Sequence, residues 1–229
     1  MSPVKLDSLS TKKTPVVGDI LYSTAAGKLT LDPTTNSVNN IPIAICVIPE
    51  VMENFTEGDN SEGAVKTARF VSINYMNYST PTTGSKDYRF MYFSNYGVTI
   101  GNVKGNPYKD SYVGGKWNTQ QCLSKVTNLE QYICNGVTNS MGKGYCAPAC
   151  CCVAYSTPGT KPGDWYLPSV GELYQIYENR STIKEKRTAL VGSGFYEASY
   201  WSSRGWDKSN EYYVSLYSGS IYCGGKNNS

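Results

Sequence analysis

The strongest constraint on the fold is a local pattern at residues 163–181, which read GDWYLPSVGELYQIYENRS. An aromatic segment ends at Pro168, Ser169 follows it, and Glu172 comes three residues later. Serine at the N-cap and glutamate at the third helical position form a capping box, in which each side chain accepts a hydrogen bond from the other residue's backbone N–H. The pattern therefore predicts an extended aromatic segment that runs directly into a helix after Ser169.

The residues after this junction have the spacing of an amphipathic helix. Leu173, Ile176 and Tyr177 follow the i, i+3, i+4 rule, which places side chains on one face. Leu167, two residues before the N-cap, is expected to pack beneath this helix. Because the capping box already accounts for Glu172, we interpret its carboxylate as part of the scaffold and not as a catalytic group.

Histidine is absent from the 229 residues. This excludes imidazole general bases, Ser-His-Asp and Cys-His nucleophiles, and metal sites that contain histidine. Mechanisms that use only carboxylates survive, and their candidate acids are Asp164, Glu172, Glu197 and Asp207. No pairing of these acids can be recognised from their positions, and we expect a protein that is not an enzyme.

The charge pattern argues against nucleic acid and membrane as partners. The net charge is +3, and the lysines and arginines are scattered. The densest basic cluster, around Lys184, Lys186 and Arg187, is interrupted by Glu185 and is typical of a solvated helix face. No segment resembles a transmembrane span, so we expect no nucleic-acid binding and no membrane insertion.

The chain has eight cysteines, whose even number is compatible with disulfides or with a metal site: Cys46, Cys122, Cys134, Cys146, Cys150, Cys151, Cys152 and Cys223. The first residues contain no apolar signal region, so we expect synthesis and folding in a reducing cytosol, where disulfides are uncommon. Mostly free, buried cysteines are favoured, Cys223 among them. The alternative, a zinc site from Cys134, Cys146, Cys150 and Cys152, lacks paired CxxC spacing, so we expect no metal or other cofactor.

The chain divides into three predicted segments. Residues 1–15 are polar and are expected to form an arm, and residues 16–80 a small β unit for attachment or oligomerisation. The second segment contains four strand-like stretches, at residues 16–23, 27–32, 41–50 and 64–76, with a loop at 53–63. A linker-like stretch at 77–87 precedes the third segment, residues 81–229.

The third segment alternates predicted strands and helices, which makes the fold class α+β. Strands are expected at residues 88–94 and 97–102. One helix should begin with Asn118 as its N-cap, and a second near Pro148. The tail reads as strand, loop, strand, turn and strand, with Ser218-Gly219-Ser220 as a hairpin turn.

Tyrosine is the compositional outlier, with 20 residues. Two interpretations are compatible. Tyrosine gives rigid, amphipathic contact area on surfaces that recognise other molecules, and it also suits strands. The tail after residue 194 has the composition of a recognition surface, although period-2 alternation allows only half of EYYVSLY to face solvent. A buried position in the core is the competing interpretation, above all for Tyr213 and Trp201.

The order of the motifs resembles one branch of the C-type-lectin-like fold, found in bacterial surface proteins and in phage receptor-binding or variable proteins. The motifs are GKWNTQQ, a Cys/Ala-rich helix, GDWYLPSVGEL, YWSS and YYVSLYSGSI, across about residues 85–229. The residues that carry the resemblance are Trp165, Tyr166, Leu167, Pro168, Ser169, Glu172, Leu173, Trp201, Ser202 and Ser203. It implies a lectin-like domain with two to three helices and a curled antiparallel sheet.

The resemblance does not extend to calcium-dependent sugar binding. The tripeptides with which sugar-binding C-type lectins hold calcium, Glu-Pro-Asn or Gln-Pro-Asp with Trp-Asn-Asp, do not occur in this chain. Asp207, Asn210 and Glu211 could supply only part of the six to eight oxygen ligands that calcium takes. The metal-dependent cysteine motif of the related formylglycine-generating enzymes is not found either.

The first segment is similar to segments that precede such domains in structural proteins of crAss-like phages of gut Bacteroidetes. The resemblance implies a head-fibre-type or other virion appendage, made in the cytoplasm of a bacterial host. Its expected partners are further copies of itself (a trimer favoured, a dimer possible), other virion proteins through the N-terminal region, and a host-surface or mucosal glycan or protein. The expected ligand-binding residues are Arg204, Trp206, Asp207, Asn210, Tyr212 and Tyr217, with Tyr213 beside them.

Two other functions remain open at this point. A bacterial cell-surface adhesin of the same fold is less favoured, because neither a signal peptide nor a lipoprotein cysteine is recognised near the start. A capsule-degrading enzyme with a carboxylate pair is less favoured because histidine is absent and Glu172 has a scaffold role.

Overall fold

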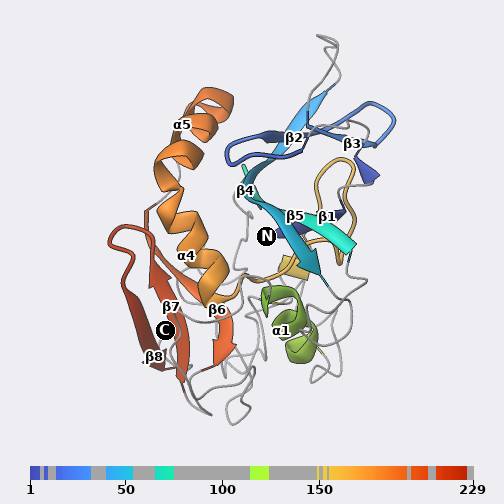
Figure 1. Ribbon diagram of the computed structural model, residues 1–229. Helices are drawn as coiled ribbons and strands as arrows, with labels where there is room; N and C mark the ends of the chain where they lie inside the picture. The colour runs from blue at the N-terminus through green and yellow to red at the C-terminus, as the bar shows by residue number, and fades with distance from the viewer. Residues whose placement is uncertain are drawn as a thin grey trace, which may run out of the picture. The chain divides into compact units, whose positions relative to one another are not determined.

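The computed structural model describes residues 1–5, 8–9, 14–31, 40–53, 65–74, 114–123, 149, 152–153, 155–194, 197–205 and 210–225. Within these residues the fold is α+β, with three helices and two antiparallel sheets, as predicted (Figure 1). The chain forms two compact units. The first contains Met1–Tyr75, Ser156–Trp165 and Gln175–Tyr196, and the second contains Met76–Tyr155, Tyr166–Tyr174 and Glu197–Ser229.

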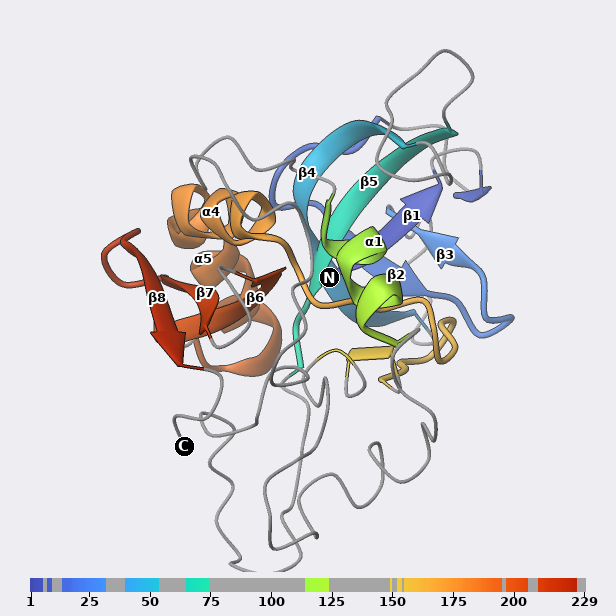
Figure 2. The ribbon, with the colours of Figure 1, turned by 90° about the horizontal axis from the view of Figure 1, so that it is seen from below.

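A curled five-stranded sheet forms the centre of the first unit, with strand order β1-β5-β4-β2-β3 (Figure 2). The strands are β1 (Ser2–Lys5), β2 (Ile20–Ser23), β3 (Leu29–Thr30), β4 (Ile41–Glu53) and β5 (Val65–Ser72), all paired antiparallel. The predicted strand-like stretches at 16–23, 27–32, 41–50 and 64–76 thus each contain a strand. The segment from Ile43 to Val47 is fully buried, as its continuous apolar sequence predicts.

Strand β4 continues through both of its prolines, Pro42 and Pro49, and beyond the predicted end at residue 50. The pairing of β4 with β2 changes register between Pro42 and Ala44. The pairing of β4 with β5 changes register between Ile48 and Val51, on either side of Pro49. Proline has no N–H for the ladder and is therefore tolerated where a bulge interrupts regular pairing. The prolines therefore coincide with irregularities of β4 instead of ending it.

The first residues differ from the predicted arm. Ser2–Lys5 form β1, which pairs with β5, for example Val4 with Ala68. The side chains of Met1, Val4 and Leu9 are buried. Burial of these three apolar side chains offsets the cost of ordering the chain end. The polar composition of residues 1–15 therefore hides an apolar subset that belongs to the core of the first unit.

Helix α5 (Arg180–Val191) belongs to the same unit and packs against β4 (Figure 1). Its Ile183 is buried, and it ends at Gly192, whose φ of 73° is left-handed and whose N–H bonds to the Thr188 carbonyl. This is an αL cap, for which glycine is the favoured residue. Helix α4 (Val170–Glu178) precedes α5, and the boundary between the two units lies within it, after Tyr174.

The second unit contains helix α1 (Gly114–Leu123) and a three-stranded sheet of order β6-β7-β8. The strands are β6 (Ser199–Gly205), β7 (Asn210–Ser215) and β8 (Ile221–Gly225). β7 and β8 form the predicted hairpin, in which Gly219 has a φ of 74°. Helix α1 begins at Gly114, before the expected N-cap Asn118, which lies inside the helix with its side chain buried.

Several predicted elements lie wholly or largely outside the described residues. These are the strands at 88–94 and 97–102, the loop at 53–63 and the linker at 77–87. Of the helix predicted near Pro148, Ala149, Cys152 and Val153 are described, and all three are helical. The lectin-like architecture of the second unit and the domain boundaries at 15 and 80 remain predictions.

Candidate functional site

The junction at Pro168–Glu172 has the capping box that the sequence predicts. The Ser169 N–H donates to Oε2 of Glu172 at 2.7 Å, and the Glu172 N–H donates to Oγ of Ser169 at 3.2 Å. The other carboxylate oxygen, Oε1, accepts a 2.5 Å hydrogen bond from the Tyr166 hydroxyl. Glu172 is completely buried. Both oxygens are therefore used to fix the start of α4, which confirms the scaffold interpretation of this residue.

Helix α1 is fastened to the extended segment before the junction. The Thr119 hydroxyl accepts the Leu167 N–H at 3.1 Å and donates to the Gly115 carbonyl at 2.7 Å. Gly115 has no room for a side chain, because an added Cβ would meet Oε2 of Glu172, the Leu167 carbonyl and the Ser169 N–H. Close approach of backbone to a neighbour is a position where glycine is needed. The GKWNTQQ motif thus packs directly on the junction.

Strand β6 completes the scaffold through an irregularity at Ser202 and Ser203. The register shifts between Trp201 and Gly205. Ser203 donates its N–H to the Pro168 carbonyl at 2.7 Å and accepts a hydrogen bond from the Asn118 amide. Ser202 donates its hydroxyl to the Tyr212 carbonyl and accepts the Arg204 N–H. Within this unit, α1, the junction and β6 are one hydrogen-bonded scaffold.

Three aromatic side chains form a ladder across the three-stranded sheet. Trp201, Tyr213 and Tyr222 are register partners on β6, β7 and β8. The Trp201 and Tyr213 rings meet edge to face, with centroids 5.2 Å apart, and Tyr213 stacks on Tyr222 at 5.3 Å and 23°. An added Cβ on Gly224 would lie 3.0 Å from the Tyr213 ring, so glycine leaves room for the ladder. Tyr213 and Trp201, for which burial was the competing interpretation, are part-exposed.

The hairpin tip between β7 and β8 presents a tyrosine from a rigid base. Leu216 is completely buried, and its N–H donates to the Ala198 carbonyl at 2.9 Å. The next residue, Tyr217, is 75% exposed. Side-chain hydrogen bonds among Ser215, Ser218 and Ser220 brace the same loop. Because the anchor and the braces hold the backbone, Tyr217 is displayed at a small cost in backbone entropy.

Of the expected ligand-binding residues, the structure brings some to the surface and buries others. Tyr217 is exposed and Asn210 is part-exposed, whereas Arg204 and Tyr212 are 6% and 3% exposed. Arg204 and Tyr212 lie beside other buried residues, Ser203 and Glu211, with the Arg204 guanidinium 5.9 Å from the Tyr212 ring centroid, so they do not contribute exposed surface as expected. Trp206 and Asp207 lie outside the described residues.

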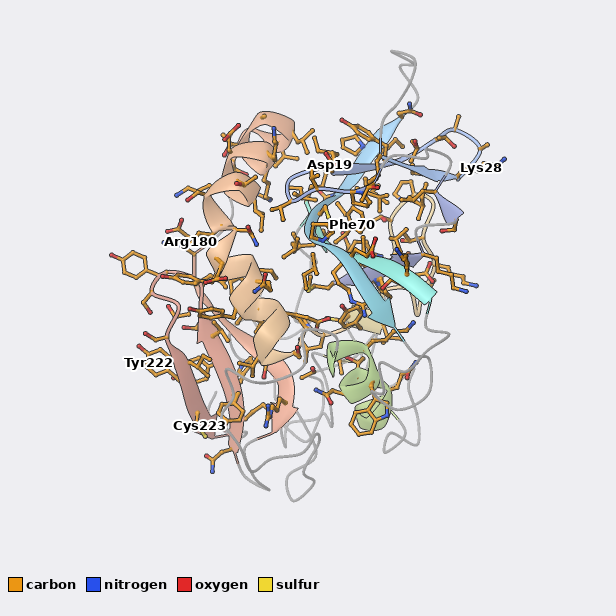
Figure 3. The ribbon with its side chains drawn as sticks, in the orientation of Figure 1. Asp19, Lys28, Phe70, Arg180, Tyr222 and Cys223 are labelled. Atoms are coloured by element: carbon orange, nitrogen blue, oxygen red, sulfur yellow. The ribbon has the colours of Figure 1, made fainter. Side chains whose placement is uncertain are left out.

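Tyr222, which was not among the expected ligand-binding residues, is 46% exposed. It lies with Cys223 on β8, the outer strand of the three-stranded sheet (Figure 3). The signal that could have found it is the hairpin register, since the predicted turn at Ser218–Ser220 places Tyr222 opposite Tyr213. Cys223 is exposed, in contrast to the buried position that we expected.

The acids and thiols offer no further constellation within the described part of the chain. Asp164 accepts the Lys161 N–H in a turn, Glu197 is part-exposed ahead of β6, and Asp207 is outside the described ranges. Cys46 is a free, buried thiol, as expected, whereas most members of the alternative zinc set are not described. No group of three metal-binding side chains occurs among the residues that the structure covers. Nor does any described helix have the length and apolarity to cross a bilayer.

Comparison with known proteins identifies no relative. No protein-family model, no curated protein and no solved structure matches the chain. The class that the fold and site define is an α+β protein whose second unit carries an aromatic ladder and an exposed tyrosine hairpin on a hydrogen-bonded scaffold.

Proposed function

We propose that this chain is a non-enzymatic binding protein, a head-fibre-type or other appendage of a phage virion. The second unit presents the hairpin of β7 and β8 to a glycan or protein at a host or mucosal surface. The sequence resemblance supports the virion assignment. The rigid display of Tyr217 and Tyr222 at the end of a buried scaffold supports the binding role, and this is the observation that carries the proposal.

The physical argument is one of preorganisation. A contact residue that is already ordered loses less conformational entropy when a partner binds. The buried Leu216 fixes the backbone before Tyr217, and stacking on Tyr213 fixes the ring of Tyr222, so both residues are partly ordered before any ligand arrives. Tyrosine joins an apolar ring to a polar tip, which suits partly wet contact surfaces.

The first unit is proposed to attach the protein to other virion components and to support homo-oligomerisation, with a trimer favoured. Closed symmetry repeats one interface, which is the usual route to appendages. Light scattering coupled to size-exclusion chromatography measures the mass of the purified chain. A trimer supports this part of the proposal, and a monomer at all concentrations contradicts it.

Two measurements test the proposal as a whole. Immunogold labelling of intact particles with an antibody to this chain should decorate the virion, and particles without label would overturn the virion assignment. Purified full-length protein should bind cells of a host strain, whereas Tyr217→Ala should bind less. As a matched control, Val191→Ala removes an exposed apolar side chain from the first unit and should bind like the unaltered protein.

A further inference from the structure

The aromatic ladder has one open ring face among the described residues. A centroid separation of 5.3 Å is too short for two coplanar rings side by side, so the Tyr213 and Tyr222 rings overlap face to face with an offset. The other side of Tyr213 meets Trp201 edge to face. Tyr222 is the end member, on the outer strand β8, and is 46% exposed. Its outer face is therefore the stacking surface that the ladder offers.

The part of the hairpin that carries Tyr217 and Tyr222, residues 215–225, contains no charged residue. From Ser215 to Gly225 the sequence is SLYSGSIYCGG, without Asp, Glu, Lys or Arg. Its exposed residues are Tyr217, Ser218, Tyr222 and Cys223, which supply two aromatic rings, the tyrosine and serine hydroxyls and one thiol. Among the described residues of β6, β7 and β8, the charged side chains are those of Arg204 and Glu211, and both are buried. Within this part of the sheet an ionic ligand would lose its hydration without gaining a counter-charge.

This surface chemistry selects among classes of ligand. Nucleic acid and acidic polysaccharide bind through lysine and arginine. Protein hot spots are rich in tryptophan, tyrosine and arginine, and arginine is missing from residues 215–225. A neutral pyranose instead has an apolar C–H face that packs on an aromatic ring and a rim of hydroxyls that bond to other hydroxyls. Tyr222 supplies the ring, and the serine and tyrosine hydroxyls supply polar partners.

We infer that the hairpin of residues 215–225 binds an uncharged saccharide, with one sugar ring stacked on the outer face of Tyr222 and a neighbouring part of the glycan against Tyr217. This inference rests on the proposed binding function and names its ligand class. It also places the site on the β7–β8 hairpin, and not on the buried Arg204 and Tyr212.

The test begins with a bacterial strain to which the full-length protein binds. Its surface polysaccharide is separated by anion exchange into a neutral pool and an acidic pool, and each pool competes for binding to cells. We expect the neutral pool to compete and the acidic pool to fail. Binding should change little between low and high salt, because screening weakens only charge-dependent contacts. Competition by the acidic pool alone, or loss of binding after protease treatment of the cells, would overturn the inference.

Variants localise the site. Tyr222→Ala should weaken binding to the neutral pool by about tenfold, in line with loss of one ring contact, whereas Tyr222→Phe, which keeps the ring, should stay closer to the unaltered protein. If Tyr222→Ala fails to fold, Tyr217→Ala carries the test, because its side chain is exposed. Unchanged binding in the folded alanine variants contradicts the inference. Absence of binding to every strain contradicts the proposed function itself.

Discussion

The hydroxyl of Tyr166 donates a hydrogen bond to Oε1 of Glu172 at 2.5 Å, inside a fully buried capping box. The other carboxylate oxygen accepts the Ser169 N–H. One side chain thus joins the extended aromatic segment to the start of α4. A buried carboxylate is tolerated only when hydrogen bonds replace its hydration, and here those bonds come from the motif that precedes it.

Replacing Glu172 by Ala should be strongly destabilising, because it removes the cap and leaves the Tyr166 hydroxyl and the Ser169 N–H without this acceptor. We expect a loss of roughly 2–4 kcal/mol in the free energy of unfolding, from the cap and the buried donors. Urea denaturation measures it. Glu178→Ala, at an exposed position of the same helix, is the control, and equal losses in the two variants would contradict the structural role.

Replacing Gly115 by Ala should destabilise the protein, although alanine is the better helix former by about 1 kcal/mol. The added Cβ would collide with the Glu172 carboxylate and lie 2.7 Å from both the Leu167 carbonyl oxygen and the Ser169 nitrogen. Thermal unfolding decides the sign of the change. Gln120→Ala, at an exposed position of α1, reports helix propensity alone, so a Gly115→Ala protein as stable as the Gln120→Ala protein would argue against this close packing.

Arg187 should be important for the stability of the first unit, although it is a charged residue. Its Nε donates to the Ile73 carbonyl at 2.7 Å, and Nη1 donates to the carbonyls of Ser193 and Gly194, each at 2.7 Å. Arg187→Met should cost roughly 2–4 kcal/mol in unfolding free energy, since buried carbonyls lose charge-assisted bonds.

The control for Arg187 is Lys184→Met, an exposed change on the same helix. It should alter the unfolding midpoint in urea far less. Arg187→Lys should rescue stability only in part, because an ammonium group cannot reproduce the guanidinium fork that reaches carbonyls on both sides. Full rescue by lysine would mean that charge alone, and not the fork geometry, is required.

Cys46 should make the protein less stable as the solution becomes alkaline. Burial, and then the nearby charge of Asp19, raise the pKa of the Cys46 thiol from 9.0 to about 12. The folded state therefore keeps a proton that the unfolded chain releases. The stability that the Cys46 thiol contributes is complete below about pH 9 and is lost as the pH rises through 12.

The comparison is between the unaltered protein and Cys46→Ala, with unfolding free energy measured at several pH values. Between pH 9 and 12 the unaltered protein should lose stability more steeply, by at most about 1.4 kcal/mol per pH unit, which corresponds to one proton. Parallel pH profiles would show that this thiol does not hold its proton preferentially in the folded state.

The stacked pair Tyr213 and Tyr222 should be energetically coupled. A double-mutant cycle with Tyr213→Ala and Tyr222→Ala isolates their interaction, for which we expect about 0.5–1.5 kcal/mol. Additive losses, with a coupling energy near zero, would contradict a preformed ladder. Tyr217→Ala combined with Tyr213→Ala serves as a control pair, since no ring contact joins these two residues among the described contacts.

Much of the local structure could be predicted from the sequence, because it depends on neighbours along the chain. The capping box of Ser169 and Glu172, the buried face of Leu173 and Ile176 and the turn at Gly219 all follow from spacing and residue type. The start of α1 could not be placed in this way. Asn118 is a good N-cap in isolation, but its side chain instead bonds to Ser203, 85 residues away.

In the candidate site, too, some features follow from the sequence and others only from the packing of the folded chain. The sequence by itself determined that the tail is rich in tyrosine and ends in a hairpin turn at Ser218–Ser220, that histidine chemistry is excluded, and that a helix starts after Ser169. Only the tertiary structure decided which tyrosines are exposed. Alternation places Tyr212, Val214 and Leu216 on one face and Tyr213, Ser215 and Tyr217 on the other, and packing of β7 within its own unit buries the first set and leaves Tyr213 stacked under Tyr222. How far each remaining tyrosine is exposed depends on its neighbours across the sheet, which the sequence of one strand does not contain.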